Sequence, residues 1–194
     1  MLNFVISDLH VMDRSQKFLF NSDKETAFCR FSEVIFESKG NLILAGDIFD
    51  FTGMTPCQNG NLEFFHEVLS SSQLNQEAMN LAGTFRSTKQ LLLACLAVYP
   101  RFFEVLSKLA EQKRLIYIPG NHDCDFLRSS SQDDLADVLG VAHDCIEWTR
   151  QYEKGFSFVV SHGNQFDPPN NTDRGCQNPG FVFTSALYHA VLPA

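Results

Sequence analysis

The sequence lacks the features that mark secreted and membrane-spanning proteins. Its first residues, Leu2 to Ile6, have neither the basic start nor the longer apolar run of a signal peptide. The most apolar stretch, Leu91 to Tyr99, is too short to cross a bilayer and ends at Pro100. These absences predict a protein with no transmembrane segment, located in the cytoplasm.

Basic charge is also scarce. The chain has 15 Lys and Arg against 23 Asp and Glu, a net charge of −8, and no run of five like charges. A protein that binds nucleic acid through a basic surface needs many Lys and Arg contacts to phosphate, so this class is disfavoured. A phosphate-bearing substrate stays open, because bound metal cations supply local positive charge that composition does not record.

Paired cysteines are missing as well. No Cys-x-x-Cys pair and no zinc-finger spacing occurs among the six cysteines, at positions 29, 57, 95, 124, 145 and 176. We therefore expect reduced thiols, although disulfide pairing cannot be deduced from spacing.

What the chain contains is the alternation of an α/β protein. Its 194 residues, 44% of them apolar, suit a single domain over 1–194. Apolar runs predict strands at 2–6, 42–45, 115–118 and 156–160. Between the first two, the Ser22-Asp23-Lys24-Glu25 capping box predicts a helix that ends at Gly40. Strand, helix, strand in this order predicts parallel strands joined by a crossover, and a further short helix is expected over 131–139.

A long helical insertion is expected at 52–113, between the second and third strands. Residues 76–112 have a helical pattern that is interrupted at Gly83 and Pro100. We interpret the insertion as a cap over an active site. Its apolar side chains either cover an apolar or lipid-like substrate or simply form the core of the cap; they are Phe64, Phe65, Leu91, Leu92, Leu93, Phe102 and Phe103.

Polar residues of metal-binding type follow each predicted strand. The motifs are Asp8-Leu9-His10, Gly46-Asp47-Ile48-Phe49-Asp50, Gly120-Asn121-His122-Asp123 and His162-Gly163. Each alone is typical of a turn, but four in order, each after an apolar strand, predict a common site at the carboxyl-end rim of a parallel sheet. Residues i and i+2 of an extended segment point the same way, which places Asp8 beside His10. Mixed oxygen and nitrogen donors suit Mn, Fe or Zn better than Ca.

Together the four motifs resemble the calcineurin-like metallophosphoesterase superfamily, over residues 4 to about 170. The resemblance implies a β-sandwich flanked by helices, with two divalent ions at the strand ends. It implies that Asp8 and His10 hold the first ion, that Asp47 bridges, and that Asn121 and His162 hold the second. His122 would be the catalytic group beside the phosphoryl, whereas Asp50 and Asp123 would orient neighbouring groups.

The chain departs from the family pattern in one respect. The Gly-His-x-His motif that gives each ion one more histidine is absent, and His189 stands alone. We expect a truncated product or an amino-terminal fragment whose second sheet is incomplete and whose metal shells each lack one ligand. A non-catalytic or weakly metal-binding remnant of the same fold is the alternative.

The expected activity is phosphoester hydrolysis by a metal-bridging hydroxide, with Mn as the first choice of metal. Phe51 stands where serine/threonine phosphatases of the superfamily carry a phosphate-gripping Arg, which disfavours that class. The 162–167 segment is loosely similar to UDP-2,3-diacylglucosamine pyrophosphohydrolases, although these carry Arg where this chain has His122. A small-molecule phosphoester, a nucleotide-diphospho-lipid and a phosphodiester therefore all stay open as substrates, and the sequence does not indicate the oligomeric state.

Overall fold

A four-stranded parallel sheet forms the centre of the molecule. The computed structural model describes residues 2–13, 19–54, 87–155, 158–172, 179–180 and 184. The sheet order is β1-β2-β3-β4, and all neighbours are parallel. The strands are β1 (Asn3–Ile6), β2 (Asn41–Ala45), β3 (Leu115–Ile118) and β4 (Ile146–Trp148). The predicted α/β fold is confirmed. The sequence patterns did not predict β4, which is only three residues long.

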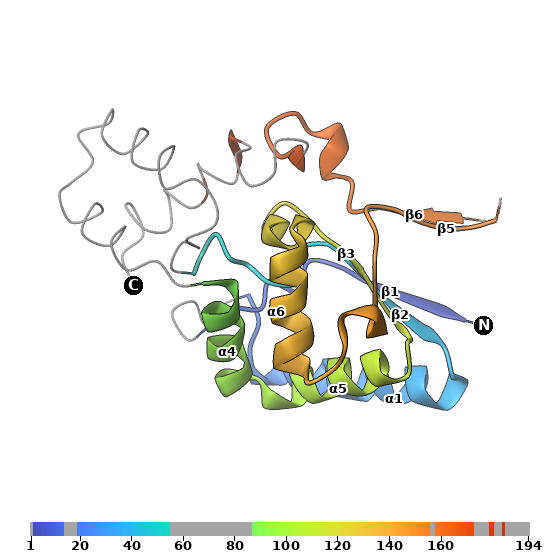
Figure 1. Ribbon diagram of the computed structural model, residues 1–194. Helices are drawn as coiled ribbons and strands as arrows, with labels where there is room; N and C mark the ends of the chain where they lie inside the picture. The colour runs from blue at the N-terminus through green and yellow to red at the C-terminus, as the bar shows by residue number, and fades with distance from the viewer. Residues whose placement is uncertain are drawn as a thin grey trace.

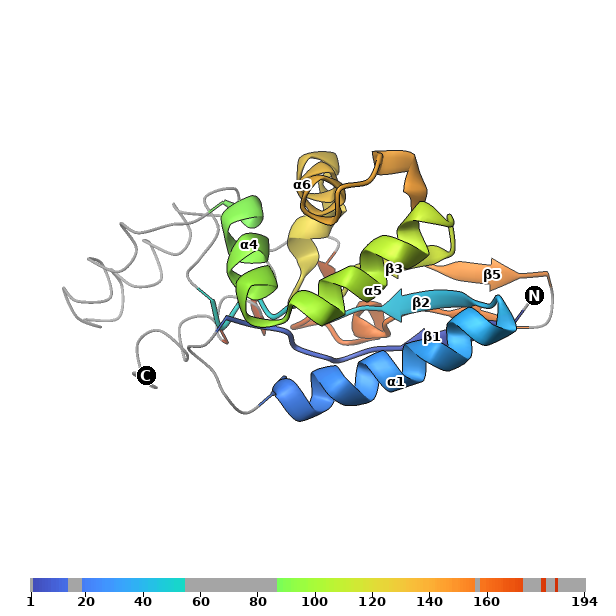
Figure 2. The ribbon, with the colours of Figure 1, turned by 90° about the horizontal axis from the view of Figure 1, so that it is seen from below.

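Helices gather on one face of this sheet (Figures 1 and 2). They are α1 (Ser22–Ser38), α4 (Thr88–Val98), α5 (Pro100–Glu111) and α6 (Ser129–Leu139). Short 3₁₀ helices lie at η1 (Cys124–Leu127), η2 (His143–Cys145) and η3 (Asn164–Phe166). The predicted helix at 131–139 is confirmed as α6.

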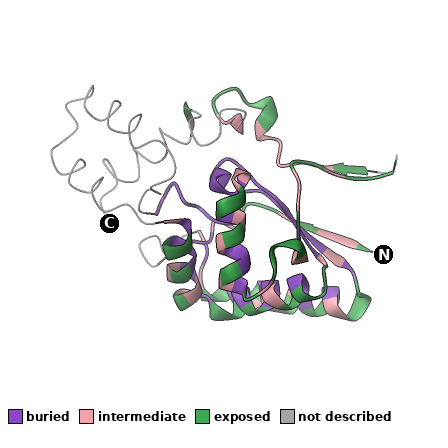
Figure 3. Cartoon of the chain, in the orientation of Figure 1, coloured by how far each residue is buried: buried purple, intermediate pink, exposed green. Residues whose placement is uncertain are grey.

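The two central strands, β2 and β3, are buried on both faces. Leu42 and Leu44 of β2 point into the large core beneath the helices, whereas Ile43 between them belongs to a second, smaller cluster on the other face. The same alternation holds in β3, where Tyr117 faces the helices and Ile116 faces away. Figure 3 shows the buried strands in the interior.

A β-hairpin covers the face opposite the helices (Figure 1). β5 (Tyr152–Lys154) and β6 (Phe158–Val160) pair antiparallel, and Tyr152 and Val160 pack on the small isoleucine cluster. The expectation that the strand before His162 extends the parallel series is therefore wrong. Only residues 155–157 separate it from β5, and a parallel connection needs a crossover of roughly a dozen residues or more.

The start of α1 also differs from the prediction. Asn21 is the N-cap, and its side chain accepts the backbone N–H groups of Asp23 and Lys24. Glu25 is buried, and its carboxylate accepts the first N–H groups of α5, those of Arg101 and Phe102, at 3.1 Å each. The carboxylate expected to cap its own helix thus caps its neighbour.

Helices α4 and α5, from the second half of the expected 52–113 insertion, belong to the core. Leu91, Leu92, Phe102 and Phe103 are at most 2% exposed, so they are packed inside the protein and not presented to a substrate. Residues 55–86, with Phe64 and Phe65, lie outside the described residues, and a cap there stays a prediction. In the described part of the chain, no single helix has the length and apolarity for a membrane span; α4 and α5 pass that test only as a pair bent by 114°.

The cysteines follow the expectation only in part. Cys29, Cys95 and Cys145 are free thiols. Cys124 is disulfide-bonded, so the expectation of reduced thiols throughout is wrong. No spacing motif in the sequence identifies this bond.

Candidate metal centre

The loops that follow β1, β2 and β3 are bonded to one another at the carboxyl-end rim of the sheet. The backbone N–H of Asp8 donates to the carbonyl of Gly46, and that of His10 donates to the carbonyl of Asp47, both at 3.0 Å. The carbonyl of His122 accepts the N–H of Phe51 at 3.2 Å. Three of the four predicted motifs therefore form one connected layer of backbone.

Strained backbone is concentrated in this layer. Asp8, His10 and Asp47 have φ angles of 55°, 50° and 55°, which L-residues adopt at a cost of about 1–3 kcal/mol each. The other two non-glycine residues with positive φ in the described part are Lys39 and Lys113, which follow helices α1 and α5. Asp8 and His10 are thus not on an extended segment, and the i, i+2 reasoning that paired them is wrong.

Two glycines make room for the functional side chains. A Cβ on Gly46 would lie 2.3 Å from the imidazole ring of His162. A Cβ on Gly120 would lie 2.1 Å from Oδ1 of Asp47 and 2.5 Å from its backbone nitrogen. Any larger residue at either position would displace a candidate metal ligand.

One group of donor atoms centres on Asp47. Ligand atoms of Asp8, Asp47 and His162 lie within 4.8 Å of one another. Nε2 of His162 is 3.2 Å from Oδ2 of Asp47 and 3.2 Å from Oδ1 of Asn121. The backbone carbonyl of Ala45, 2.9 Å from Nδ1 of His162, fixes the ring and leaves Nε2 directed at the oxygens. Although His162 follows the hairpin and not a strand of the main sheet, it reaches the rim.

The second group is a histidine pair on one carboxylate. Asp50 is fully buried, with Oδ2 3.1 Å from Nδ1 of His10 and Oδ1 3.0 Å from Nδ1 of His122. The two rings meet edge to face at 4.8 Å. When each Nδ1–H donates to Asp50, the Nε2 atoms are left for a ligand or a proton. Thr52 completes this group, because its hydroxyl contacts Asp50 and lies 3.0 Å from Nδ1 of His122.

Asp123 links the loop that follows β2 to the loop that follows β3. It is fully buried and accepts the N–H of Ile48 at 2.9 Å, the N–H of Gly120 at 2.6 Å and the hydroxyl of Tyr117 at 2.7 Å. Burial, with the neighbouring charge of Asp47, raises the pKa of Asp123 to about 6. Its hydrogen bonds fix the spacing between the loops that carry Asp47 and Asn121.

The carboxylates and histidines of the site stabilise one another's charged forms. Burial opposes ionisation of Asp47, but His162 and His122 outweigh it and lower the pKa of that carboxyl. Burial likewise opposes protonation of His162, but Asp47 raises the imidazole pKa to about 9. At Asp50, hydrogen bonds from both histidines outweigh burial and hold the pKa well below its usual range. The site therefore holds ionised carboxylates beside protonated imidazoles. A bound cation would supply the positive charge that the imidazole protons otherwise provide.

The donor set fits divalent ions. Carboxylate, amide and imidazole donors converge from four loops, the mixture that Mn, Fe and Zn accept. The grouping differs from the expected pairs, since Asp8 lies with Asp47 and His162, whereas His10 lies with Asp50 and His122.

Sequence reasoning missed two residues of this site. Thr52 is signalled only by its place two residues after Asp50, and Tyr117 looks like an ordinary buried strand residue. His189 lies outside the described residues.

Comparison with known proteins agrees with this geometry. A family model described as calcineurin-like phosphoesterase matches residues 4–184, which is most of the chain. Neither the curated proteins nor the solved structures gave a match. The matched span includes all four loop motifs, and the chain belongs to the calcineurin-like phosphoesterase family.

Proposed function

We propose that the protein hydrolyses phosphoesters with a dinuclear centre of divalent metal ions. The observation that carries this proposal is the convergence of Asp8, Asp47, Asn121 and His162 from separate loops, with Nε2 of His162 at 3.2 Å from two different oxygen donors. Membership in a phosphoesterase family supports the same reaction class.

The side chains of the site have two roles, metal binding and proton transfer. Asp8, Asp47, Asn121 and His162 would hold one ion, and His10 the other, with Asp47 shared. When bound, such ions stabilise charge on phosphoryl oxygens and lower the pKa of water to give a nucleophile near neutral pH.

His122 keeps a proton for the leaving oxygen. Burial disfavours protonation of its ring, but the Asp50 carboxylate outweighs burial and raises the imidazole pKa. Asp50 also fixes the ring through Nδ1, so that Nε2 is the position that donates.

Substrate, metal and location stay proposals. Phe51 is buried and stacks on Phe49 with ring centroids 5.8 Å apart, so it belongs to the core and cannot take the place of a phosphate-binding Arg. A small-molecule phosphoester is the first choice, and pyrophosphohydrolase or phosphodiesterase activity is the alternative. Mn is the first choice of metal, Fe and Zn follow, and the cytoplasm is the proposed location.

The missing Gly-His-x-His motif favours one competing function, a remnant that holds metal without turnover. Hydrolysis of 4-nitrophenyl phosphate and of bis(4-nitrophenyl) phosphate by the intact protein separates the two. We expect EDTA to abolish turnover and Mn to restore it better than Ca. Asp47→Asn should remove the activity, whereas exposed Asp144→Asn should keep it and so exclude a contaminating phosphatase. Activity that is indifferent to chelation would contradict the two-metal function, and metal binding without turnover would support the remnant.

A further inference from the structure

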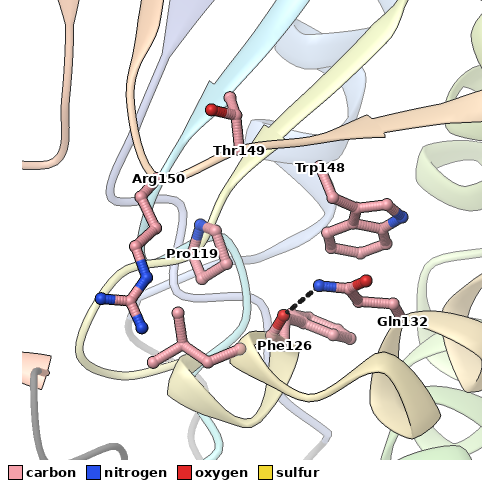
Figure 4. Close-up of a pocket in the computed structure, with 7 residues that line it drawn as sticks. Pro119, Phe126, Gln132, Trp148, Thr149 and Arg150 are labelled. Carbon is pink, nitrogen blue, oxygen red and sulfur yellow. Dashed lines mark hydrogen bonds between the residues drawn. The ribbon is translucent and has the colours of Figure 1, made fainter.

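The backbone that carries His122 is held on both sides of the residue. The N–H of His122 donates to Oδ1 of Asp47 at 2.8 Å, and its carbonyl accepts the N–H of Phe51 at 3.2 Å. Further along the same loop, the carbonyl of Phe126 accepts Nε2 of Gln132 in α6 at 2.7 Å, beside a cavity of about 220 Å³ (Figure 4). Rotation of the His122 ring is therefore the freedom that side-chain contacts must remove.

Oδ1 of Asp50, the first acceptor for this ring, is shared among several donors. It accepts the backbone N–H groups of Thr52 and Gly53 at 3.1 Å each, and the hydroxyl of Thr52 also contacts it. Nδ1 of His122 lies 3.0 Å from the same oxygen. A carboxylate oxygen has about two lone pairs, so four donors cannot all be well bonded there. A second acceptor would hold the ring better than Asp50 alone.

The hydroxyl of Thr52 is placed to be that second acceptor. Its oxygen lies 3.0 Å from Nδ1 of His122, and Thr52 is fully buried, so water does not compete for the hydroxyl. Because the carboxylate of Asp50 can only accept hydrogen bonds, the hydroxyl proton points at Asp50 and a lone pair of the hydroxyl oxygen is left for the ring. A bare Nδ1 would face two acceptors with no proton to share, so Nδ1 carries a proton.

We propose that Thr52 is a positioning residue whose hydroxyl fixes the tautomer of His122 and the direction of Nε2, the atom that protonates the leaving oxygen. This inference rests on the proposed function for the reaction, whereas the hydrogen bond to the ring does not. In the reaction a hydroxide oxygen bonds to phosphorus, the ester P–O bond breaks with its electron pair on the leaving oxygen, and that oxygen takes the Nε2 proton. The ring ends neutral with Nδ1–H still bonded to Thr52 and Asp50, so no hydrogen bond on that side has to rearrange.

The leaving group makes this role measurable, because a poor leaving group depends most on proton donation. Phenyl phosphate releases phenol, whose pKa of about 10 is like that of tyrosine, whereas 4-nitrophenyl phosphate releases a much more acidic phenol. We expect Thr52→Val to lower kcat for phenyl phosphate about 10–100-fold, to lower kcat for 4-nitrophenyl phosphate at most about threefold, and to leave metal content unchanged. Thr52→Ser keeps the hydroxyl and should retain most of the parent kcat.

Thr88→Val is the matched control. Thr88 is also fully buried, and its hydroxyl lies 3.2 Å from that of Ser131, outside the metal centre. This variant should hydrolyse the two esters in the same ratio as the parent. Equal loss of kcat for both esters in Thr52→Val would show a merely structural role and overturn the proposal, as would loss of metal from that variant.

The hydrogen bond is tested without turnover by ¹H–¹⁵N NMR of the metal-free protein in EDTA. The ring signals of His122 are identified by their absence from His122→Asn. We expect a proton on Nδ1 in the parent and in Thr52→Ser, and about tenfold faster exchange of that proton with water in Thr52→Val, since one of its two acceptors is lost. An unprotonated Nδ1 in the parent, or equal exchange in all three proteins, would overturn the proposal. If the parent hydrolyses neither ester, the proposed function fails, and the exchange rates still decide whether Thr52 holds the ring.

Discussion

Gly120→Ala should disable the metal centre while leaving the fold in place. The new Cβ would lie 2.1 Å from Oδ1 of Asp47 and 2.5 Å from its backbone nitrogen. A side-chain oxygen can rotate away, but the backbone nitrogen cannot, because Asp123 and the adjoining loops hold that segment. We therefore expect the Asp47 carboxylate to be displaced.

The size of each effect follows from the structure. Overpacking of this kind costs about 1–3 kcal/mol of folding free energy. Gly140→Ala is a matched control, since Gly140 has φ of 70° and its Cβ would meet nothing within 4 Å. Left-handed strain at that position costs about 1–2 kcal/mol. Both variants should thus melt several degrees below the parent, at roughly 2–4 °C per kcal/mol.

Metal binding should separate the two variants. Displacing a ligand should weaken metal affinity by at least the roughly 10–100-fold that loss of outer support costs. The assay is metal content per chain after gel filtration in Mn, measured beside thermal unfolding. We expect Gly120→Ala to lose metal and Gly140→Ala to keep it. Equal metal content in the two variants would refute the packing role assigned to Gly120.

Three further predictions follow from the site and its surroundings. His122→Asn should keep metal while kcat falls about 10²–10⁴-fold, whereas His162→Asn should lose metal; equal loss of metal would reverse the assigned roles. Asp47→Asn should lower metal content more than Asp8→Asn, because a shared carboxylate serves two ions, and equal occupancy by metal analysis would exclude the shared role. Burial raises the pKa of Asp125 to about 6 from 3.8, so the folded state keeps a proton that the unfolded chain releases, and stability falls as pH rises from about 4 to 6. Asp125→Asn should therefore stabilise the protein at pH 7 by about 3 kcal/mol in urea unfolding, with no gain below pH 4; a pH-independent effect would contradict this reasoning.

The sequence predicted those strands and helices whose own residues show a clear apolar or helical pattern. The apolar runs at 42–45 and 115–118 became β2 and β3, and the polar residues after them came together because parallel strands end at one rim. What failed was long-range pairing. The strand before His162 looks like the others in sequence, and only its three-residue link to β5 makes it antiparallel.

The loops that meet at the candidate site could be predicted from the sequence, whereas the grouping of their side chains could not. Asp8 and His10 lie in different groups of ligand atoms because both adopt left-handed backbone. Sequence propensities do not predict that conformation for a non-glycine residue. Glu25 shows the same limit, since a capping sequence specifies an acceptor but not the helix whose N–H groups it meets. Such choices are made by tertiary packing.

Anomalous diffraction from crystals grown with Mn tests the central claim most directly. The account predicts two Mn peaks at the carboxyl-end rim of the β1–β4 sheet, with Asp47 in contact with both. The peak on the β3 side should be ligated by Asn121 and His162, and His122 should touch neither ion. A single peak, or two peaks away from these side chains, would contradict the dinuclear centre.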